Sequence, residues 1–545
     1  METNNPAKRT HLLIAAGLAI LTLVLLLATN ADTGVTWDEP AYIGAAESYM
    51  NWYERIFTQP GKMLSQEGID KYWSANHEHP PLDKIWSGLV WALTRHITDD
   101  LTAHRLGNIL LAAGLVAMLY LLIAEYYGWK AGLIAAGLLM SLPRFFFHAH
   151  LASLDVPAAV MTFAVIFVFW KTKDRPGLGS TIALGVVWGL AVATKINAVF
   201  VMPALLLWVL IFQREKDLIL NLVYASVTAF GVFILIWPWL FPALVFRVAD
   251  YVLWITVNHW QIGQFYLHEF YMPPPWHFSF VMFAAVTPLA ILLLMITGVV
   301  RTSKEKTNQP LGFLLLINAL VPLLALAIGQ SMVYDNERLF MPAFVFTAAL
   351  AAIGLDWLLG KLKDWLAQKG HPALAKPLAA AIVLLAFVPQ MVSAATLYPH
   401  LLSYYSMTVG GLPGATRIGL ETTYWCETYN ESLDYINEHA EPGDVVWVDP
   451  YSYDVMVYYM ELGWLRDDIQ ITAPTGSAST INLVAPLTDV PYQRADFIVL
   501  HYRQTSTEYG GASWPILTWL GARVPVVQIT HQGIPLFELY HLTYN

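Results

Sequence analysis

Cysteine and charged residues are both scarce in this sequence. The 545 residues include a single cysteine, Cys426, which excludes an internal disulfide. Only 13% of the residues are charged and 57% are hydrophobic. Soluble globular proteins average about 25% charged residues. This balance excludes an ordinary soluble domain and predicts a polytopic α-helical membrane protein.

Lysine is absent from Tyr398 to the end of the chain. This segment holds 16 acidic residues and five arginines, a formal charge of −11, which leaves about +1 for the rest of the chain. We expect no nucleic-acid partner, because no basic surface is available to neutralise phosphates.

Long apolar runs, by contrast, are frequent. About eleven segments are apolar enough to predict membrane spans in a lipid bilayer: 11–29, 104–125, 131–147, 156–170, 179–193, 197–212, 218–238, 277–300, 310–329, 339–358 and 378–397. Basic clusters precede the first span and follow the fourth, sixth, eighth and tenth spans. Because positive charge stays on the cytoplasmic side, this pattern predicts a cytoplasmic N-terminus and an extracytoplasmic C-terminal segment. We expect an uncleaved first span and a prokaryotic plasma membrane.

Two domains follow from this topology. Residues 1–397 form the predicted transmembrane domain, and its first outer loop, 30–103, contains two amphipathic segments, Ala41–Phe57 and Leu82–Thr94, suited to lying on the membrane interface. Residues 398–545 alternate short apolar runs with Gly, Pro and Asp turns, which predicts an acidic α/β domain.

An acidic pair, Asp38-Glu39, lies a few residues after the first span. Membrane anchoring favours Lys, Arg, Trp or Tyr at such a boundary. Two carboxylates there suit a site that accepts a proton or holds a polar acceptor.

Other ionisable residues fall on the same predicted outer face, although each also has a structural explanation. Asp155 before Val156-Pro157 is typical of a helix start, and Lys195 of an interfacial anchor. Glu337-Arg338 is consistent with an interfacial ion pair. Histidines such as those in the pairs His77/His79 and His148/His150 more often form ordinary hydrogen bonds at a membrane interface than bind a ligand. The joint placement of all these residues favours a functional site.

These residues occur in an order that resembles a known family. The series is Asp38-Glu39, then His79-Pro80-Pro81-Leu82-x-Lys84, Leu154-Asp155-Val156-Pro157, Gly189-Leu190-Ala191-x-x-Thr194-Lys195 and Tyr334-Asp335-x-Glu337-Arg338-Leu339-x-x-Pro342. Over roughly residues 30–430, the chain resembles polyprenyl-phosphate-sugar-dependent glycosyltransferases of the GT-C fold, in particular the protein O-mannosyltransferase and aminoarabinose transferase families. A trefoil-like domain of the O-mannosyltransferases is missing, and residues from about 440 onward match nothing.

The resemblance implies an inverting transfer of a sugar, mannose or another hexose or pentose, from a polyprenyl-phosphate donor to a hydroxyl of a protein, lipid or glycan acceptor. It implies Asp38 as the general base, with Glu39 holding the acceptor and Asp155 orienting sugar or acceptor. The implied phosphate and substrate ligands are the following: His79, Lys84, Lys195, Glu337 and Arg338.

Alternatives remain at the sequence level. No cofactor is firmly implied, but a divalent metal ion is left open, with Glu78, His148 and His150 as weak candidate ligands beside the others. A transporter or lipid flippase with an extracytoplasmic sensor or binding domain is the competing class. It is disfavoured because no internal repeat is present and the polar groups gather at helix ends. An anchored assembly protein would leave the loop carboxylates without a role. The Trp-Trp-Asp signature of oligosaccharyltransferases is missing.

Overall fold

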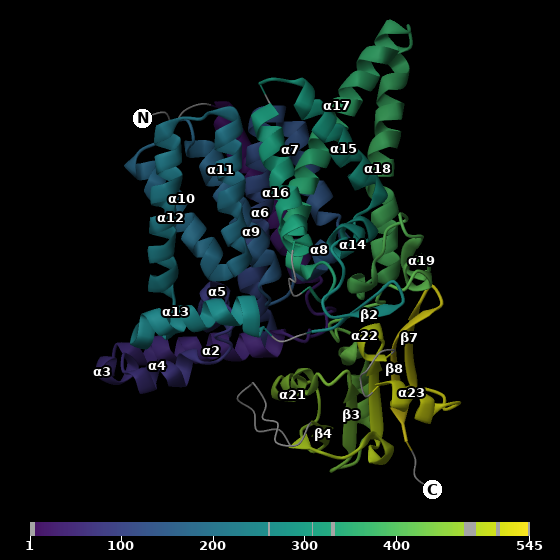
Figure 1. The fold of residues 1–545 in the computed structure, drawn as a ribbon. Helices are drawn as coiled ribbons and strands as arrows, with labels where there is room; N and C mark the ends of the chain where they lie inside the picture. The colour runs from purple at the N-terminus through teal and green to yellow at the C-terminus, as the bar shows by residue number, and fades with distance from the viewer. Residues whose placement is uncertain are drawn as a thin grey trace.

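The structure is a computed structural model that describes residues 6–259, 262–307, 309–328, 333–473, 487–507 and 513–542. It consists of a bundle of long helices with a smaller sheet domain at one end (Figure 1). The helices that run along the bundle are α1 (Pro6–Ala28), α6 (Asp100–Tyr127), α7 (Trp129–Met140), α9 (Asp155–Thr172), α10 (Leu178–Thr194), α11 (Val201–Phe212), α12 (Lys216–Ile236), α15 (Leu289–Lys304), α16 (Gln309–Ala327), α17 (Pro342–Gln368) and α18 (Ala375–Leu397).

The predicted polytopic helical fold is confirmed. The predicted number of spans, about eleven, is larger than the number of helices that are long enough to cross a membrane. Within the described residues, eight helical segments are long and apolar enough to cross a membrane, or nine with the pair α14 (Phe278–Val286) and α15, which is bent by 111°. Three helical segments among the predicted spans have only 10–17 residues: Trp129–Met140, Leu178–Thr194 and Ile196–Phe212. A helix of such length spans a bilayer only where its flanks contribute or the bilayer thins.

One further segment is long and apolar enough to cross a membrane, although the sequence predicts an outer loop there. Pro238–Asn258 is apolar, but it is broken into a short helix η2 (Pro238–Ala243), α13 (Leu244–Leu253) and η3 (Trp254–Asn258). Figure 1 shows α13 lying across the end of the bundle rather than along it.

The first outer loop forms helices that also lie across this end. They are α2 (Glu39–Ile56), α3 (Pro60–Met63), α4 (Gln66–Trp73) and α5 (Leu82–Thr94). Helices therefore form at both predicted amphipathic segments, α5 with the same bounds, and their place on the membrane interface stays a prediction. Aromatic side chains join the layer together, as in the stacking of Tyr49 on Trp73 at 4.2 Å between ring centroids.

The C-terminal part contains a mixed six-stranded sheet in the order β5-β4-β3-β6-β8-β7. Its strands are β3 (Val445–Asp449), β4 (Gln470–Thr472), β5 (Leu487–Thr488), β6 (Phe497–His501), β7 (Val527–His531) and β8 (Ile534–His541). The first four in this order pair in parallel, and β8 joins β6 and β7 antiparallel. The helices in this part are α19 (Gly411–Arg417), α20 (Leu433–His439), α21 (Tyr453–Glu461), α22 (Gln504–Thr507) and α23 (Ser513–Leu520). The predicted α/β sheet domain is confirmed.

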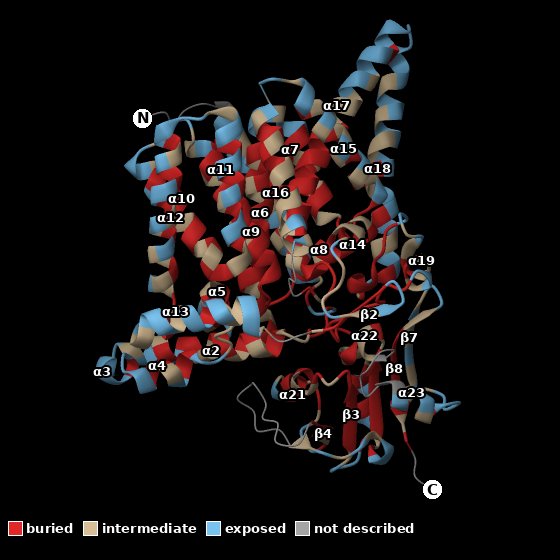
Figure 2. Cartoon of the chain, viewed as in Figure 1, coloured by how far each residue is buried: buried red, intermediate tan, exposed pale blue. Residues whose placement is uncertain are grey.

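The bundle core does not end at the predicted domain boundary after residue 397. Leu401, Tyr405, Tyr424 and Trp425 belong to the same buried apolar cluster as the membrane helices. Figure 2 shows buried residues running from the bundle into the sheet. The division at 397/398 stays a prediction, and packing joins the sheet domain firmly to the bundle.

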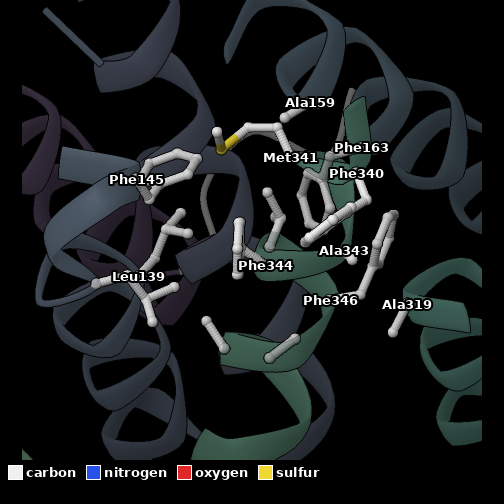
Figure 3. Packing of buried hydrophobic residues seen from close by; sticks show 14 of the residues in the cluster. Leu139, Phe145, Ala159, Phe163, Ala319, Phe340, Met341, Ala343, Phe344 and Phe346 are labelled. Atoms are coloured by element: carbon white, nitrogen blue, oxygen red, sulfur yellow. The ribbon is translucent and has the colours of Figure 1, made fainter. Parts of the chain in front are cut away.

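The centre of the bundle is packed by aromatic and small side chains (Figure 3). The residues labelled there are Leu139, Phe145, Ala159, Phe163, Ala319, Phe340, Met341, Ala343, Phe344 and Phe346. Phe340 and Met341 directly follow Arg338-Leu339. The backbone that carries Arg338 is therefore anchored in the buried core of the bundle.

Helices α15 and α17 approach each other at two glycines. A Cβ atom on Gly354 would lie 2.1 Å from the Leu294 carbonyl oxygen, and one on Gly298 would lie 1.9 Å from the Leu350 carbonyl oxygen. Small residues of this kind permit close backbone contact between membrane helices.

We expect Gly354→Ala to lower the free energy of unfolding by about 1–3 kcal/mol, because the added methyl group meets backbone and the helices must separate. The matched control is Gly360→Ala on the same helix, where a Cβ meets nothing within 4 Å. Thermal unfolding in detergent compares the two variants. Equal melting temperatures would contradict this account of the interface.

Candidate active site

Asp38 lies at the N-terminal end of α2, but its side chain does not cap the helix. Its Oδ2 atom accepts hydrogen bonds from Arg338 Nη2 at 2.5 Å and from the Tyr42 hydroxyl at 3.2 Å. Burial raises the pKa of Asp38, an effect that the neighbouring Arg338 charge opposes. Asp38 thus binds Arg338, far away in the sequence, as well as Tyr42 in the first turns of its own helix.

Arg338 is the partner that connects the most segments. It opens the short helix η4 (Arg338–Phe340), just before α17. Besides Asp38, its Nη1 atom donates to Asp335 at 2.7 Å, and its Nε atom lies 3.5 Å from Asp155 Oδ2. Its guanidinium also lies over the ring of Trp425, 4.4 Å from the centroid, where a cation–π contact holds it flat.

Asp155 and Lys195 form the next pair. Asp155 is the first residue of α9, and Lys195 separates α10 from the short helix η1 (Ile196–Phe200). Lys195 Nζ lies 2.5 Å from Asp155 Oδ1. The side chain of Asp155 is 1% exposed, whereas that of Lys195 is 10% exposed. The lysine therefore keeps some access to the space beside the pair.

The C-terminal domain contributes a cation that the sequence did not reveal. Arg503 follows β6, and its Nη2 atom donates to Asp335 Oδ1 at 2.6 Å. Its Nη1 atom donates to the Tyr424 carbonyl oxygen at 3.1 Å. Its Nε atom lies 3.5 Å from Glu421 Oε1. The result is one largely buried ion-pair chain of four carboxylates and three cations, whose members are Asp38, Asp155, Asp335, Glu421, Lys195, Arg338 and Arg503.

Glu337 lies behind this ion-pair chain in a second polar group. Its carboxylate contacts Arg144 Nη1 at 2.5 Å, the Tyr424 hydroxyl at 3.1 Å and His148 Nε2 at 3.6 Å. His148 Nδ1 in turn lies 4.0 Å from Asp155. Burial alone would raise the pKa of Glu337, but Arg144 and His148 lower it, so the carboxylate stays ionised. The side chain of Glu337 is 0% exposed, and it stabilises the site from behind the ion-pair chain.

A cavity of about 610 Å³ opens beside the ion-pair chain. Its polar end is lined by Tyr42, Glu78, His79, Asp155, Lys195, His259, Tyr334 and Arg338. Apolar side chains of α16, η1, the start of α11 and the 251–257 segment line most of the remainder, among them Val199, Val201, Ile255, Val257, Val321, Pro322 and Leu326. The cavity therefore joins a charged end to a long apolar wall, the arrangement that an amphiphile with an anionic head requires.

Several residues predicted at the site are buried away from the cavity. Glu39 is 0% exposed, and it accepts two hydrogen bonds from Arg105, both at 2.8 Å, and one each from the backbone of Thr36 and Ala152, both at 2.9 Å. Burial opposes ionisation, but the charge of Arg105 and these bonds lower the pKa of Glu39. Its carboxylate is fully used in fixing the loop, which argues against the acceptor-holding role expected for it.

Lys84 and His150 are likewise occupied. Lys84 Nζ donates to two oxygen atoms of Asn76 and to the His79 carbonyl oxygen, at 2.6–2.9 Å. Burial lowers the pKa of Lys84 to about 7. His150 is 1% exposed, and its Nε2 atom lies 2.8 Å from the Thr29 hydroxyl. Lys84 thus orders the 76–84 turn, and His150 joins the start of the outer loop to the bundle.

His79 and Glu78 remain beside the cavity, as predicted. Burial lowers the pKa of His79 well below its usual value, so this ring is neutral and able to donate one hydrogen bond. Within the described residues, the weak metal candidates Glu78, His148 and His150 do not come together as a group of three ligands around one point. The donor set at this cavity therefore does not form a recognisable metal centre.

Part of the chain matches a known family in sequence. Residues 78–241 match the sequence model of the family described as dolichyl-phosphate-mannose-protein mannosyltransferase. The matched range contains Asp155 and Lys195. Comparison with curated proteins finds no match.

Solved structures share the fold over almost the whole chain. ArnT from Cupriavidus metallidurans in the apo state has a TM-score of 0.51 and 14% identity, with 98% of each chain covered. The same protein bound to undecaprenyl phosphate has a TM-score of 0.52 and 13% identity, with 97% of each chain covered. The archaeal oligosaccharyltransferase AglB from Archaeoglobus fulgidus, in complex with an inhibitory peptide and a dolichol-phosphate, has a TM-score of 0.52 and 12% identity over 91% of this chain and 70% of its own. These likenesses establish the fold, and the GT-C fold class predicted from the sequence is confirmed.

We expect Arg503→Met to destabilise the protein by about 3–5 kcal/mol, because it leaves the buried carboxylates of Asp335 and Glu421 short of a cation. The matched control is Arg494→Met, which removes an exposed arginine from the same domain. Thermal unfolding of the purified protein measures both. A loss no larger than that of Arg494→Met would mean that Arg503 does not hold the site together.

Proposed function

We propose that this protein is a membrane glycosyltransferase that moves a sugar from a polyprenyl-phosphate carrier to an acceptor hydroxyl. The observation that carries the proposal is the cavity whose charged end holds Asp155, Lys195 and Arg338 and whose other walls are mostly apolar. The family match and the shared fold support the same class of enzyme. The structures of ArnT with undecaprenyl phosphate and AglB with dolichol-phosphate make a polyprenyl phosphate the natural donor carrier.

The donor fits the cavity in one orientation. The isoprenoid chain would lie along the apolar wall formed by α16 and η1, within the membrane. Its phosphate would lie at Lys195 and Arg338. Lys195 donates one of its three N–H bonds to Asp155, and Arg338 gives two of its five to Asp38 and Asp335, so donors remain for the phosphate oxygens. His79 and Glu78 would contact the sugar or the phosphate from the opposite wall.

Asp38 is the proposed general base. It would accept the proton of the acceptor hydroxyl while the oxygen attacks the anomeric carbon and the bond from this carbon to the phosphate oxygen breaks. The negative charge that develops on the leaving phosphate would be stabilised by Lys195 and Arg338, fixed in place before the reaction. A single displacement of this kind inverts the anomeric configuration. Asp155 holds Lys195 and Arg338 and would orient the sugar.

We further propose that the N-terminus is cytoplasmic and the sheet domain, residues 398–545, is extracytoplasmic. The start of α1 and the turn from α17 to α18, which contains Lys369 and has further lysines in the adjoining helix ends, lie at the end of the bundle opposite to the sheet domain, as positive charge on the cytoplasmic side requires (Figure 1). The membrane we expect is a prokaryotic plasma membrane. The acceptor is a hydroxyl of a protein, lipid or glycan that reaches the cavity from outside.

The test is sugar transfer from a panel of radiolabelled polyprenyl-phosphate hexoses and pentoses to membrane acceptors, with and without a chelator. We expect Asp38→Asn to reduce transfer about 10²–10⁴-fold, because the proton acceptor is lost. Its melting temperature should fall only slightly, because Asp155 and Asp335 still neutralise Arg338. The neighbouring variant Glu39→Gln should instead lower the melting temperature, because it breaks the buried pair with Arg105. Transfer from no donor, or full activity of Asp38→Asn, would overturn the proposal.

The raised pKa of Asp38 predicts the pH dependence of transfer. The base acts when deprotonated, so activity should rise with pH through an apparent pKa above 3.8, the ordinary value for an aspartate, and then level off. Initial rates at saturating donor across pH 4–9 measure this limb. Activity that is independent of pH, or that falls as pH rises over the acid range, would exclude Asp38 as the base.

A further inference from the structure

A second group of ionisable residues lies at the junction of α2, α6 and the sheet domain. Glu47 comes from the middle of α2, and Asp100 and His104 come from the first turns of α6. One potential ligand atom from each of the three lies within 4.8 Å of the others. None of them lines the cavity of the candidate active site.

His104 is held rigidly in this group. Its ring stacks on Trp91 at 5.1 Å and 15°, and its Nδ1 atom lies 3.4 Å from the Ser87 hydroxyl. Metal-binding histidines are commonly oriented in this way, by a contact to the ring nitrogen that does not bind the metal.

The other ring nitrogen of His104 has no hydrogen-bond partner among the described residues, although the residue is 0% exposed. The nearest acidic atom is Glu47 Oε1 at 3.6 Å, which is too far for a hydrogen bond. A buried polar atom normally has a partner. Here Glu47 Oε1 lies just beyond hydrogen-bond distance of His104 Nε2, at a separation that suits two ligands of one metal ion.

Asp100 is oriented by neighbours from two parts of the chain. Trp91 Nε1 donates to its Oδ1 at 2.6 Å, and the hydroxyl of Tyr458, on α21 of the sheet domain, donates to its Oδ2 at 3.1 Å. A third carboxylate, Glu461, lies near. Partial burial and the charges of Glu47 and Asp100 raise the pKa of Glu461 to about 7. The carboxylates of Glu47 and Asp100 thus place negative charge around His104.

We propose that Glu47, Asp100 and His104 bind a divalent transition-metal ion such as Zn²⁺ or Mn²⁺. One imidazole and two carboxylates are a common ligand set for these ions, which bind such ligands at about 2.0–2.2 Å. Two ligands of one ion at about 2.2 Å lie at most about 4.4 Å apart, so atoms within 4.8 Å of one another need only small side-chain rotations to surround it. Water would complete the coordination.

The role of this ion is structural. It would join α2, whose first turn follows Asp38, to the start of α6, and through Asp100 and Tyr458 to the sheet domain. Loss of the ion should loosen the first outer loop without removing any group from the active-site cavity. Because this site is separate from the cavity, the inference stands or falls independently of the proposed reaction.

The test uses the full-length protein without a polyhistidine tag, purified in detergent, stripped with a chelator and titrated with Zn²⁺ or Mn²⁺. We compare the wild type with His104→Gln and with Glu47→Gln, which keeps the shape of the side chain. Matched controls are His96→Gln and Glu54→Gln, which remove an exposed histidine and an exposed glutamate of the same loop. Metal content and melting temperature are the two readouts.

The expected result is one tightly bound ion per wild-type chain and a melting temperature a few degrees higher with the ion than without it. Affinity should fall at least 10-fold in His104→Gln and Glu47→Gln and stay unchanged in both controls. If His104→Gln does not fold, Glu47→Gln decides the matter alone. Wild-type binding no tighter than that of Glu47→Gln would overturn the proposal and leave an ordinary histidine–glutamate ion pair.

Discussion

The buried guanidinium of Arg338 is the group on which the arrangement of the site depends. It contacts carboxylates from three separate segments: Asp38 before α2, Asp155 at the start of α9, and Asp335 in its own loop. Taking a charge out of water costs several kcal/mol, which only close, well-oriented partners offset. The chain therefore has to bring all three carboxylates to one point, and this requirement fixes the first outer loop against the bundle.

The sheet domain belongs to the same arrangement. Arg503 binds Asp335 from the opposite side, and Trp425 both stacks on Arg338 and donates to Asp335 at 3.1 Å. A domain attached to a helical bundle need not contribute to its site. Here a cation of the domain neutralises a carboxylate that also binds Arg338, and the apolar core runs through the connection. The domain is thus a structural part of the site.

The sequence predicts the type of fold well because its signals are local. Hydrophobic runs, the bounds of α5 and the short strands of the C-terminal segment all depend on neighbouring residues in the chain. Asp38, Asp155, Lys195 and Arg338 were also predicted together, from their order and their common face. The number of full-length spans was less well predicted, because apolar composition does not reveal where a helix breaks or bends.

The different contacts made by the two residues of the acidic pair could not be predicted from the sequence. Asp38 and Glu39 are adjacent, yet one reaches Arg338 and the other is fully bound by Arg105 and two backbone amides. Which carboxylate binds Arg338 and which binds Arg105 depends on contacts with α6 and with residue 152, far away in the sequence. Arg503 was missed for the same reason, since an isolated arginine in a strand-rich segment carries no signal of a partner 168 residues away.

The central claim is that this cavity holds a polyprenyl phosphate with its head group at Lys195 and Arg338. The most direct measurement is a cryo-electron microscopy map of the protein with a polyprenyl phosphate bound. The account predicts phosphate density in contact with both side chains and lipid density along the wall that includes Val321 and Leu326. Phosphate density at a different place, or a lipid bound outside this cavity, would contradict it.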